Sequence, residues 1–287
     1  MMITIFTPTY NRGHLLQRLY ESLCHQTFND FEWIIIDDGS VDNTEDVVKT
    51  FLSENLINIR YIKQDNGGKH RAINHGVRVA KGELFFIVDS DDQLPSDSLY
   101  IISRTYKAVR SDKSFAGISG LDSSIDGKII GTGLPIDYID CSTLDIEYKY
   151  CITGDLAEVF RTDVLKEFPF PEIDGEKFCP EDLVWHRIAL KYKLRYINKV
   201  IYYAEYQDDG LTSKIIRIRM NSPMASITYY SELTLMNIPF VQKIKSAINY
   251  WRFRFCYKGK DIIPVISKIW IWTAPLGLLM HLNDLRK

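Results

Sequence analysis

Residues 89–92 read Asp-Ser-Asp-Asp and directly follow an apolar run at residues 83–88, Glu-Leu-Phe-Phe-Ile-Val. Carboxylates this close together repel one another, and a bound cation removes that cost. Few His or Cys residues lie nearby, and hard oxygen ligands of this kind suit Mg²⁺ or Mn²⁺, which bridge to substrate phosphates. The plainer alternative is a solvated acidic turn in which Ser96 or Asp97 caps the next helix.

Strand-like and helix-like patterns alternate on both sides of this acidic cluster. Apolar residues with helical spacing separate the strand-like runs, and Gly82 is expected to close the helix before the fourth run. Such alternation implies an α/β fold with a mostly parallel central sheet and right-handed crossovers. The predicted strands cover residues 2–7, 31–36, 59–62 and 83–88, and a further helix is predicted at residues 96–110.

Three loops follow strands of this expected sheet and therefore share one edge. They are residues 7–12 (Thr-Pro-Thr-Tyr-Asn-Arg), 37–40 (Asp-Asp-Gly-Ser) and 89–92. Open α/β folds bind ligands outside the carboxyl ends of their strands, so the convergence of the loops predicts a ligand site. Each loop alone has a simpler explanation, such as a tight turn with Gly39 at positive φ or a helix entry after Pro8.

The ordered set of these segments resembles a known enzyme family. Together with Gln-Thr-Phe-Asn-Asp-Phe-Glu at residues 26–32 and the stretch from Asn74 through Gly82-Glu83, the three loops resemble the family-2 glycosyltransferases. Members of that family use nucleotide-sugar donors, have the GT-A fold and mostly invert the anomeric centre. The resemblance is strong over residues 3–110, and it continues more weakly to about residue 215.

The resemblance also implies which residues bind the donor and a metal ion. The family's DXD motif matches Asp89-Ser90-Asp91, whose two aspartates are the expected ligands of Mn²⁺ or Mg²⁺. Tyr10 is expected to stack on the nucleobase, Asp38 to bind its edge, and Asp89 to accept a hydrogen bond from the ribose. The expected donor contacts are Pro8, Thr9, Tyr10, Asn11, Arg12, Asp38, Gly39, Lys69, Asn74, Asp89 and Ser90.

A glycine-rich basic loop at residues 67–71, Gly-Gly-Lys-His-Arg, opens a predicted helix. Backbone amides and cations at a helix start suit a phosphate group, and Lys69 is the side chain expected to contact it. The loop lacks the Walker A spacing, so it is not a P-loop. The alternative is a simple turn into a helix whose basic residues are solvated.

A second acidic pair, Glu181-Asp182, follows Pro180 at the start of a predicted helix. An inverting transfer needs one general base for the acceptor hydroxyl, and the resemblance implies that Asp182 is this base, with Glu181 orienting the acceptor. Acidic residues are also favoured in the first turn of any helix, which is the structural alternative. Asp155 and Glu158 are weaker candidates for contacts with a sugar.

The composition argues against several other classes of protein. A formal net charge of −2 gives no global basic field for nucleic acid. Five cysteines without paired spacing fit reduced thiols better than a disulfide framework. The N-terminus has no basic segment, and its apolar run is too short for a signal peptide, so we expect a cytoplasmic protein. No GxGxxG follows the first strand, which argues against a dinucleotide oxidoreductase.

The chain changes character after about residue 238. Basic and aromatic residues at 243–260 are followed by an apolar stretch at residues 262–282, in which Lys268 is the only fixed charge. Pro264 and Pro275 interrupt this stretch, which favours an interfacial segment over a membrane-spanning helix. Basic residues with Trp suit the anionic cytoplasmic leaflet. A helical hairpin packed on the main domain is an alternative of nearly equal weight.

These patterns together predict a metal-dependent glycosyltransferase with a nucleotide-sugar-binding half at residues 1–95, an acceptor-binding half at 96–237 and a C-terminal extension at 238–287. UDP is the default nucleotide, and the expected acceptor is a glycan or lipid-linked glycan in surface polysaccharide synthesis at the inner face of the cell membrane. Two alternatives stay open. One is a sugar-phosphate nucleotidyltransferase, which would need a Gly- and Arg-rich loop after the first strand, and the other is a catalytically silent nucleotide-sugar-binding protein.

Overall fold

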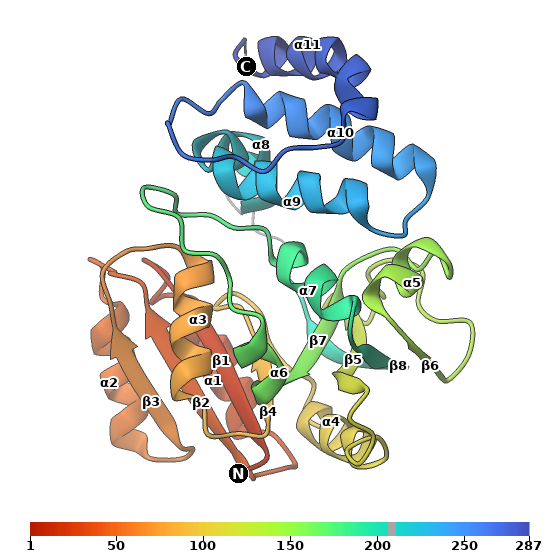
Figure 1. Ribbon diagram of the computed structural model, residues 1–287. Coiled ribbons are helices and arrows are strands. Elements are labelled where there is room, and N and C mark those ends of the chain that lie inside the picture. The colour runs from red at the N-terminus through yellow and green to blue at the C-terminus, as the bar shows by residue number, and fades with distance from the viewer. Residues whose placement is uncertain (206–210, 287) are drawn as a thin grey trace. The chain divides into compact units, whose positions relative to one another are not determined.

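A computed structural model describes residues 1–205 and 211–286. Its central feature is an eight-stranded sheet with the order β3-β2-β1-β4-β7-β5-β8-β6 (Figure 1). The chain thus has the α/β class and the mostly parallel sheet that the sequence predicts. The strands are β1 (Ile3–Thr9), β2 (Phe31–Asp37), β3 (Ile59–Lys63), β4 (Leu84–Ile87), β5 (Phe115–Ser123), β6 (Tyr138–Cys141), β7 (Leu156–Arg161) and β8 (Lys193–Tyr203).

The direction of each strand decides which loops share an edge. β1 is parallel to both β2 and β4, and β2 is parallel to β3. β7 is antiparallel to both of its neighbours, β4 and β5, and β5 is parallel to β8. Two successive antiparallel pairings restore the direction, so β5 and β8 end at the same edge as β1, β2 and β4.

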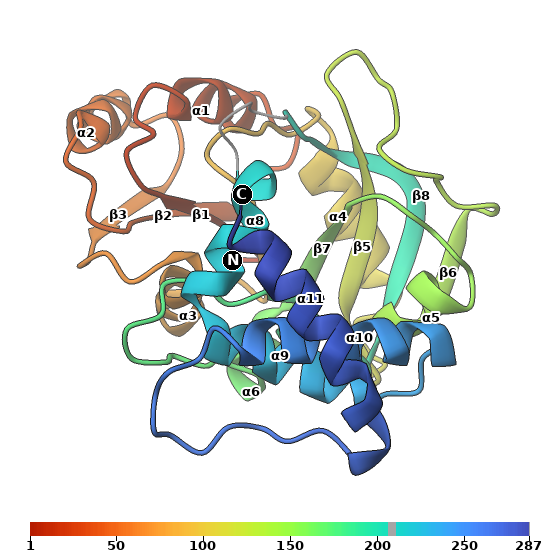
Figure 2. The same cartoon turned by 90° about the horizontal axis from the view of Figure 1, so that it is seen from above.

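Helices cover both faces of this sheet. α1 and α2 lie on one face of β1, β2 and β3, and α3 lies on the other face (Figure 2). Buried residues of α1, α2 and α4 share one hydrophobic cluster with Ile3, Ile5 and Trp33. The helices are α1 (Leu16–Cys24), α2 (Thr44–Glu54), α3 (Lys69–Val79), α4 (Ser98–Lys107), α5 (Thr143–Tyr148), α6 (Thr162–Glu167) and α7 (Glu181–Ala189).

The first four strands confirm the predicted ones, each within two residues of its expected ends. One expectation is wrong. Gly82 does not close a helix, because α3 ends at Val79; a Cβ on Gly82 would lie 2.3 Å from the backbone nitrogen of Thr4, so this glycine lets the turn approach β1. Residues 115–123, where no strand is predicted above, form β5, in which every residue is buried.

The chain forms two compact units, which we describe separately. The first contains Met1–Pro169 and Trp185–Glu205, and the second contains Phe170–Val184 and Tyr206–Lys287. The predicted division at residues 95 and 237 is a functional one, and it stays a prediction. The second unit contains the first residues of α7 and the helices α8 (Leu211–Asn221), α9 (Pro223–Leu235), α10 (Phe240–Arg254), η1 (Lys268–Thr273) and α11 (Ala274–Asp284).

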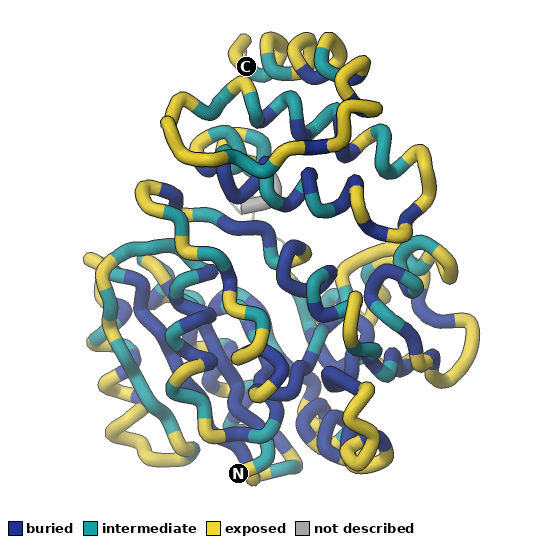
Figure 3. The backbone as a smooth tube through the Cα atoms, viewed as in Figure 1, coloured by how far each residue is buried: buried dark blue, intermediate teal, exposed yellow. Residues whose placement is uncertain are grey.

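Within the second unit, α11 packs on α10 through one narrow stripe. A Cβ on Gly277 would lie 2.4 Å from Cβ of Trp251, and Asp284 accepts two hydrogen bonds from the Arg252 guanidinium at 2.5 and 2.7 Å. Gly277 and Asp284 are seven residues apart, so they lie on the same side of the helix. Most of the remaining surface of α11 is exposed (Figure 3).

Candidate active site

The three loops singled out in the sequence lie together at the carboxyl edge of the sheet. We use the name carboxyl edge for the loops after β1, β2, β4 and β5, at residues 9–12, 37–40, 88–92 and 122–124. β1, β2 and β4 are adjacent and parallel, and Thr9 is opposite Asp37 in the register. The backbone N–H of Asp38 donates to the carbonyl oxygen of Thr9 at 2.8 Å. The predicted convergence of these loops is therefore confirmed.

The loop after β1 offers one exposed ring and one buried hydroxyl. Tyr10 is 48% exposed, so its ring is open to a stacking partner, whereas Thr9 is buried and its Oγ1 has no hydrogen-bond partner among the described residues. Asn11 has a positive φ of 54°, and its Oδ1 accepts a hydrogen bond from the N–H of Val41 at 2.8 Å. The Asn11 side chain thus holds two loops together, and Pro8 is half-buried beside them.

Asp38 is bound by the glycine-rich loop. Its Oδ1 accepts from Gln64 Nε2 at 2.8 Å and from the N–H of Gly67 at 2.9 Å, and its Oδ2 accepts from the N–H of Gly68 at 2.7 Å. Both glycine amides are therefore already used by Asp38, and the contact of this loop with phosphate through Lys69 stays a prediction. The loop holds the Asp38 carboxylate in place, beside the turn at Gly39, whose φ is +85°.

Two aspartates of the acidic loop pair with cations. Lys69 Nζ lies 2.8 Å from Asp89 Oδ2, and Arg12 Nη1 lies 2.7 Å from Asp91 Oδ2. These contacts neutralise carboxylates that would otherwise repel each other. Ser90, between them, is buried, as is Asn74 on α3. Lys69 and Arg12 are thus at the carboxyl edge, where they can also meet an anionic ligand.

Asp92 is held by β8. Its Oδ2 accepts from the Tyr202 hydroxyl at 2.6 Å, and its Oδ1 accepts from the N–H of Glu205 at 2.8 Å. The Tyr202 oxygen also accepts from the N–H of Asp89 at 3.0 Å, so one tyrosine fixes both ends of the acidic loop. Burial and the nearby Asp89 carboxylate raise the pKa of Asp92 to about 7, and the bonds from Tyr202 and Glu205 oppose that rise.

Asp122 adds a further carboxyl group to this edge. It lies near the end of β5 with 6% of its surface exposed, and its Oδ1 has no hydrogen-bond partner among the described residues. Burial, with the Asp155 and Asp92 carboxylates nearby, raises the pKa of Asp122 to about 8. Asp155 itself is exposed, in the loop that enters β7. A buried carboxyl oxygen without a partner is costly, so this position needs an explanation.

The acidic loop fits a divalent cation that binds together with a phosphate ligand. Within residues 1–205 and 211–286, no three His, Cys, Asp or Glu side chains are grouped so that they could hold a metal ion by themselves. Mg²⁺, however, usually keeps several waters and uses one or two carboxylates plus substrate phosphates. Asp91 and Asp89 supply a partial donor set of that kind.

The predicted base belongs to the second unit. Asp182 is exposed and Glu181 is half-buried, both in the first turn of α7. Asp182 Oδ2 lies 3.4 Å from the hydroxyl of Tyr229, which comes from α9. His186 is buried with its Nε2 3.1 Å from Glu147 Oε1, which agrees with a packed histidine.

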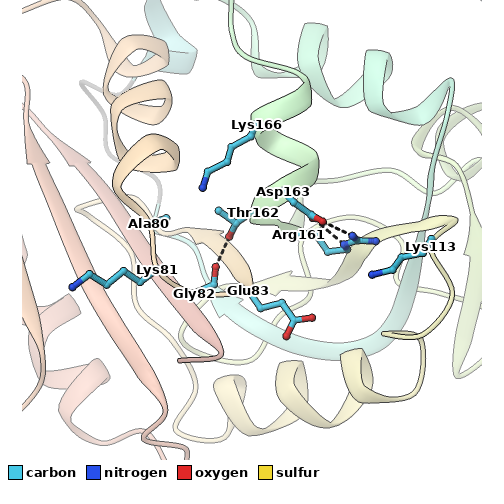
Figure 4. A pocket seen from close by; sticks show the side chains of 9 residues that line it. All are labelled: Ala80, Lys81, Gly82, Glu83, Lys113, Arg161, Thr162, Asp163 and Lys166. Carbon is cyan, nitrogen blue, oxygen red and sulfur yellow. Dashed lines mark hydrogen bonds and ion pairs between the residues drawn. The ribbon is translucent and has the colours of Figure 1, made fainter.

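A hollow of about 300 Å³ lies at the opposite edge of the sheet, where β4 begins and β7 ends (Figure 4). Its two carboxylates are already paired, Asp163 with Arg161 and Glu83 with Arg110. Thr162 and the three lysines Lys81, Lys113 and Lys166 complete its polar lining. The hollow contains none of the predicted site residues, so the chemistry of the carboxyl edge identifies the candidate site better than the size of this hollow does.

Three residues that belong to the carboxyl edge or support it were not predicted from the sequence. Gln64 and Tyr202 bind Asp38 and Asp92, and Asp122 lies beside Asp92. Tyr202 stands in a run that is recognisable as a strand, but only the tertiary fold brings its hydroxyl to the acidic loop. If residues 115–123 had been predicted to form a strand, Asp122 would have stood out as an acidic residue near the end of that strand.

Comparisons with known proteins agree with this fold. The model of the family described as glycosyl transferase family 2 matches residues 4–112. A hyaluronan synthase of Pasteurella multocida is 26% identical over 80% of this chain, which spans 24% of that protein. A GalNAc(5)-diNAcBac-PP-undecaprenol beta-1,3-glucosyltransferase of Campylobacter jejuni is 27% identical over 73% of this chain, which spans 67% of that enzyme.

Solved structures show the same architecture. TarS residues 1–349 of Staphylococcus aureus, in complex with UDP-GlcNAc, align with a TM-score of 0.67 and 21% identity over 90% of this chain and 74% of that one. The mannosyltransferase PcManGT of Pyrobaculum calidifontis, in complex with GDP-Man and Mn²⁺, aligns with a TM-score of 0.56 and 15% identity over 99% of this chain and 75% of that one. Residues 4–112 thus match glycosyl transferase family 2, and the chain has the GT-A fold of its structural neighbours.

Proposed function

We propose that this protein transfers a sugar from a nucleotide-sugar donor to a glycan or lipid-linked glycan acceptor, with inversion, in surface polysaccharide synthesis. The observation that carries the proposal is the acidic loop at residues 89–92, which shares one sheet edge with Tyr10 and Asp38. The Campylobacter jejuni relative is named for a polyprenyl-diphosphate-linked acceptor, which supports the acceptor class. UDP remains the proposed nucleotide, since TarS binds UDP-GlcNAc.

The proposed donor runs along the carboxyl edge from β2 towards β4. The exposed ring of Tyr10 supplies a stacking face for the nucleobase, and Asp38 supplies an acceptor that Gln64 and the glycine loop hold in place. The buried hydroxyl of Thr9, which lacks a partner among the described residues, can bond to the nucleoside. Asp89 accepts from the ribose, and Lys69 contacts the diphosphate.

The acidic loop is the proposed place for Mn²⁺ or Mg²⁺, with Asp91 and Asp89 as its protein ligands. When bound, the metal ion would neutralise the charge that develops on the leaving diphosphate. Arg12 and Lys69 now occupy these two carboxylates. We expect both cations to turn towards the phosphates when a donor binds, because each is already at the carboxyl edge and phosphate is the stronger anionic partner.

Asp182 is the proposed general base. It would take the proton of the acceptor hydroxyl while that oxygen attacks the anomeric carbon and the bond to the diphosphate oxygen breaks. An exposed carboxylate can meet an incoming acceptor, and the Tyr229 hydroxyl restricts its orientation. Glu181, one residue earlier, is proposed to orient the acceptor.

The second unit is the proposed site of contact with a membrane that holds the acceptor. No helix in residues 1–205 or 211–286 is long and apolar enough to cross a bilayer. Instead η1 and α11 expose a set of apolar side chains, which we call the α11 face: Ile269, Ile271, Trp272, Leu276, Leu278, Leu279, Leu282 and Leu285. Exposed Lys258 and Lys260 precede η1 in the chain, and exposed Lys268 begins it. Basic residues together with exposed apolar side chains suit an anionic bilayer surface.

A panel of sugar nucleotides tests the function. The melting temperature of the protein is measured with UDP-, GDP- and dTDP-sugars, each with and without Mn²⁺, and released nucleoside diphosphate is then assayed. We expect one nucleotide class to raise the melting temperature with Mn²⁺ and to be hydrolysed slowly. Binding without any turnover, even with glycan acceptors, would favour the silent binding protein. Release of inorganic diphosphate from a sugar phosphate and a nucleoside triphosphate would indicate a nucleotidyltransferase.

A further inference from the structure

Asp122 combines burial with an unused hydrogen-bonding atom. Among the described residues, nothing donates a hydrogen bond to its Oδ1, although only 6% of its surface is exposed. Asp92, which lies nearby, has both of its oxygens bonded, by Tyr202 and Glu205. The difference is informative, because the protein provides hydrogen-bond donors for both oxygens of Asp92 but none, among the described residues, for Oδ1 of Asp122.

The sheet topology places Asp122 in line with the proposed donor. The strand order β2-β1-β4-β7-β5 carries Asp38 on the first strand end, the acidic loop on the third and Asp122 on the fifth. Asp122 is also opposite Tyr202 in the register of β5 and β8. Paired strands have side chains on the same face at opposite positions, so Asp122 and Tyr202 lie on one side of the sheet. The Tyr202 hydroxyl contacts the acidic loop from that side.

The spacing of the strands matches the order of groups in a sugar nucleotide. Neighbouring strands are about 4.8 Å apart, so β4 and β5 are separated by about 10 Å. In the donor, the nucleoside, the diphosphate and the sugar follow one another along the molecule. With the nucleobase at the ends of β1 and β2 and the diphosphate at β4, the sugar extends towards β7 and β5.

We propose that Asp122 binds a hydroxyl group of the sugar that is transferred and thereby contributes to the choice of sugar. This inference rests on the proposed function, since it places the donor at the carboxyl edge. The ligand class is a nucleotide-linked sugar with a free ring hydroxyl within reach of Asp122 Oδ1. A hydroxyl group suits the site because it donates to a carboxylate and also accepts from a carboxylic acid.

The test compares the nucleotide alone with the nucleotide sugar. Calorimetric titration with Mn²⁺ measures the affinities of the wild type for UDP and for the UDP-sugar that binds best. In Asp122→Asn, which keeps the shape of the side chain, we expect the UDP-sugar affinity to fall about tenfold and the UDP affinity to stay within about twofold. Asp126→Asn is the matched control, because Asp126 is an exposed aspartate in the turn after β5.

Nucleotide-sugar analogues that lack one ring hydroxyl make the test sharper. They can be used with the wild type, so the test does not depend on whether a variant folds. For the wild type, removal of one particular hydroxyl should cost about the same tenfold, and removal of the others should cost less. For Asp122→Asn, that same analogue should bind as well as the full donor, because the two changes delete the same contact.

Three results would overturn the inference. An unchanged UDP-sugar affinity in Asp122→Asn would mean that a water molecule satisfies this carboxyl group. An equal loss for UDP and UDP-sugar would make Asp122 a support of the whole edge. If the wild type bound all the deoxy donors equally well, no single sugar hydroxyl would matter, and the contact would be excluded. This result would count even if every Asp122 variant failed to fold. Failure of the proposed function is distinguishable. A wild type that binds no sugar nucleotide would exclude the donor site itself, and a wild type that binds one without turnover would exclude transfer but not the contact with Asp122.

Discussion

The carboxyl edge of the first unit and the α11 face of the second depart from ordinary folding preferences in opposite ways. The edge buries Asp92 and Asp122, although carboxyl groups are rarely buried. The α11 face leaves several large apolar side chains exposed, among them Leu279 at 64%, although apolar side chains are usually buried. We propose that a different ligand covers each of these two features.

The comparison leads us to propose two separate functions for these two regions of the chain. A sugar nucleotide and a metal ion would bind the charged groups of the carboxyl edge, whereas a bilayer would bury the apolar side chains of α11. A change at the edge should therefore affect catalysis and leave membrane binding intact, and a change on α11 should do the reverse. The following predictions test this separation, beginning with the largest effect.

Asp91→Ala should reduce turnover by about 10³-fold or more, because the negative charge of the leaving diphosphate would lose its metal ion. Donor binding should also lose its dependence on Mn²⁺. Kinetics of donor hydrolysis and calorimetry measure both effects, and Asp46→Ala, at an exposed position on α2, is the control. Metal-dependent donor binding that survives in Asp91→Ala would show that the acidic loop is not the metal site.

Asp182→Asn should lower turnover by roughly 10²-fold, which is the usual scale for loss of a general base. Donor affinity should barely change, because Asp182 is proposed to face the acceptor. Donor titration beside steady-state kinetics distinguishes the two, with Asp174→Asn as an exposed control from the same unit. Turnover close to that of the wild type would leave Asp182 with only a helix-terminal role.

Leu279→Glu combined with Trp272→Glu should reduce binding to vesicles with anionic lipid by at least about tenfold, because two apolar side chains no longer enter the bilayer. Hydrolysis of the donor should remain unchanged. Co-sedimentation at low and high salt measures the binding, and Leu235→Glu is the control, since Leu235 is 75% exposed but lies at the end of α9. If the full-length protein did not bind vesicles, α11 would serve only to pack on the rest of the second unit.

The buried carboxyl group of Asp122 predicts a pH dependence of stability. Its pKa is raised to about 8, mainly by burial, and is about 3.9 in an unfolded chain. The folded state therefore holds the proton over this range, and stability falls as the pH rises from about 4 to about 8. Between pH 7 and 8, the wild type should lose about 1 kcal/mol of unfolding free energy relative to Asp122→Asn, which has no proton to lose. Urea titrations at several pH values measure the unfolding free energy of both proteins. If the free energies of the wild type and Asp122→Asn changed with pH in the same way, the prediction would be contradicted.

The sequence was sufficient for the part of the site that depends on local patterns. Apolar runs predicted β1 to β4, and the parallel arrangement then required the loops after β1, β2 and β4 to meet at one edge. The residues that hold the loops could not be predicted in the same way. Tyr202 reaches Asp92 across 110 residues of chain, and no local spacing encodes that contact.

Sequence reasoning also failed where polar residues form a buried strand. β5 reads Phe-Ala-Gly-Ile-Ser-Gly-Leu-Asp-Ser, which has the composition of a loop, yet neighbours on both sides bury it completely. In β5, tertiary partners outweighed the local preference. The contact between the glycine loop and Asp38 was also not predicted. The N–H groups of Gly67 and Gly68 donate to the Asp38 carboxylate, which lies 29 and 30 residues before them in the chain.

A crystal structure with the best-binding UDP-sugar and Mn²⁺ tests the central claim most directly. The predicted result is a nucleobase beside Tyr10 and Asp38, a diphosphate at Asp91, and a sugar that extends towards Asp122. Arg12 should then have left Asp91 for the phosphates. A nucleotide bound elsewhere, for example in the lysine-lined hollow at the opposite edge of the sheet, would contradict the assignment of the carboxyl edge as the active site.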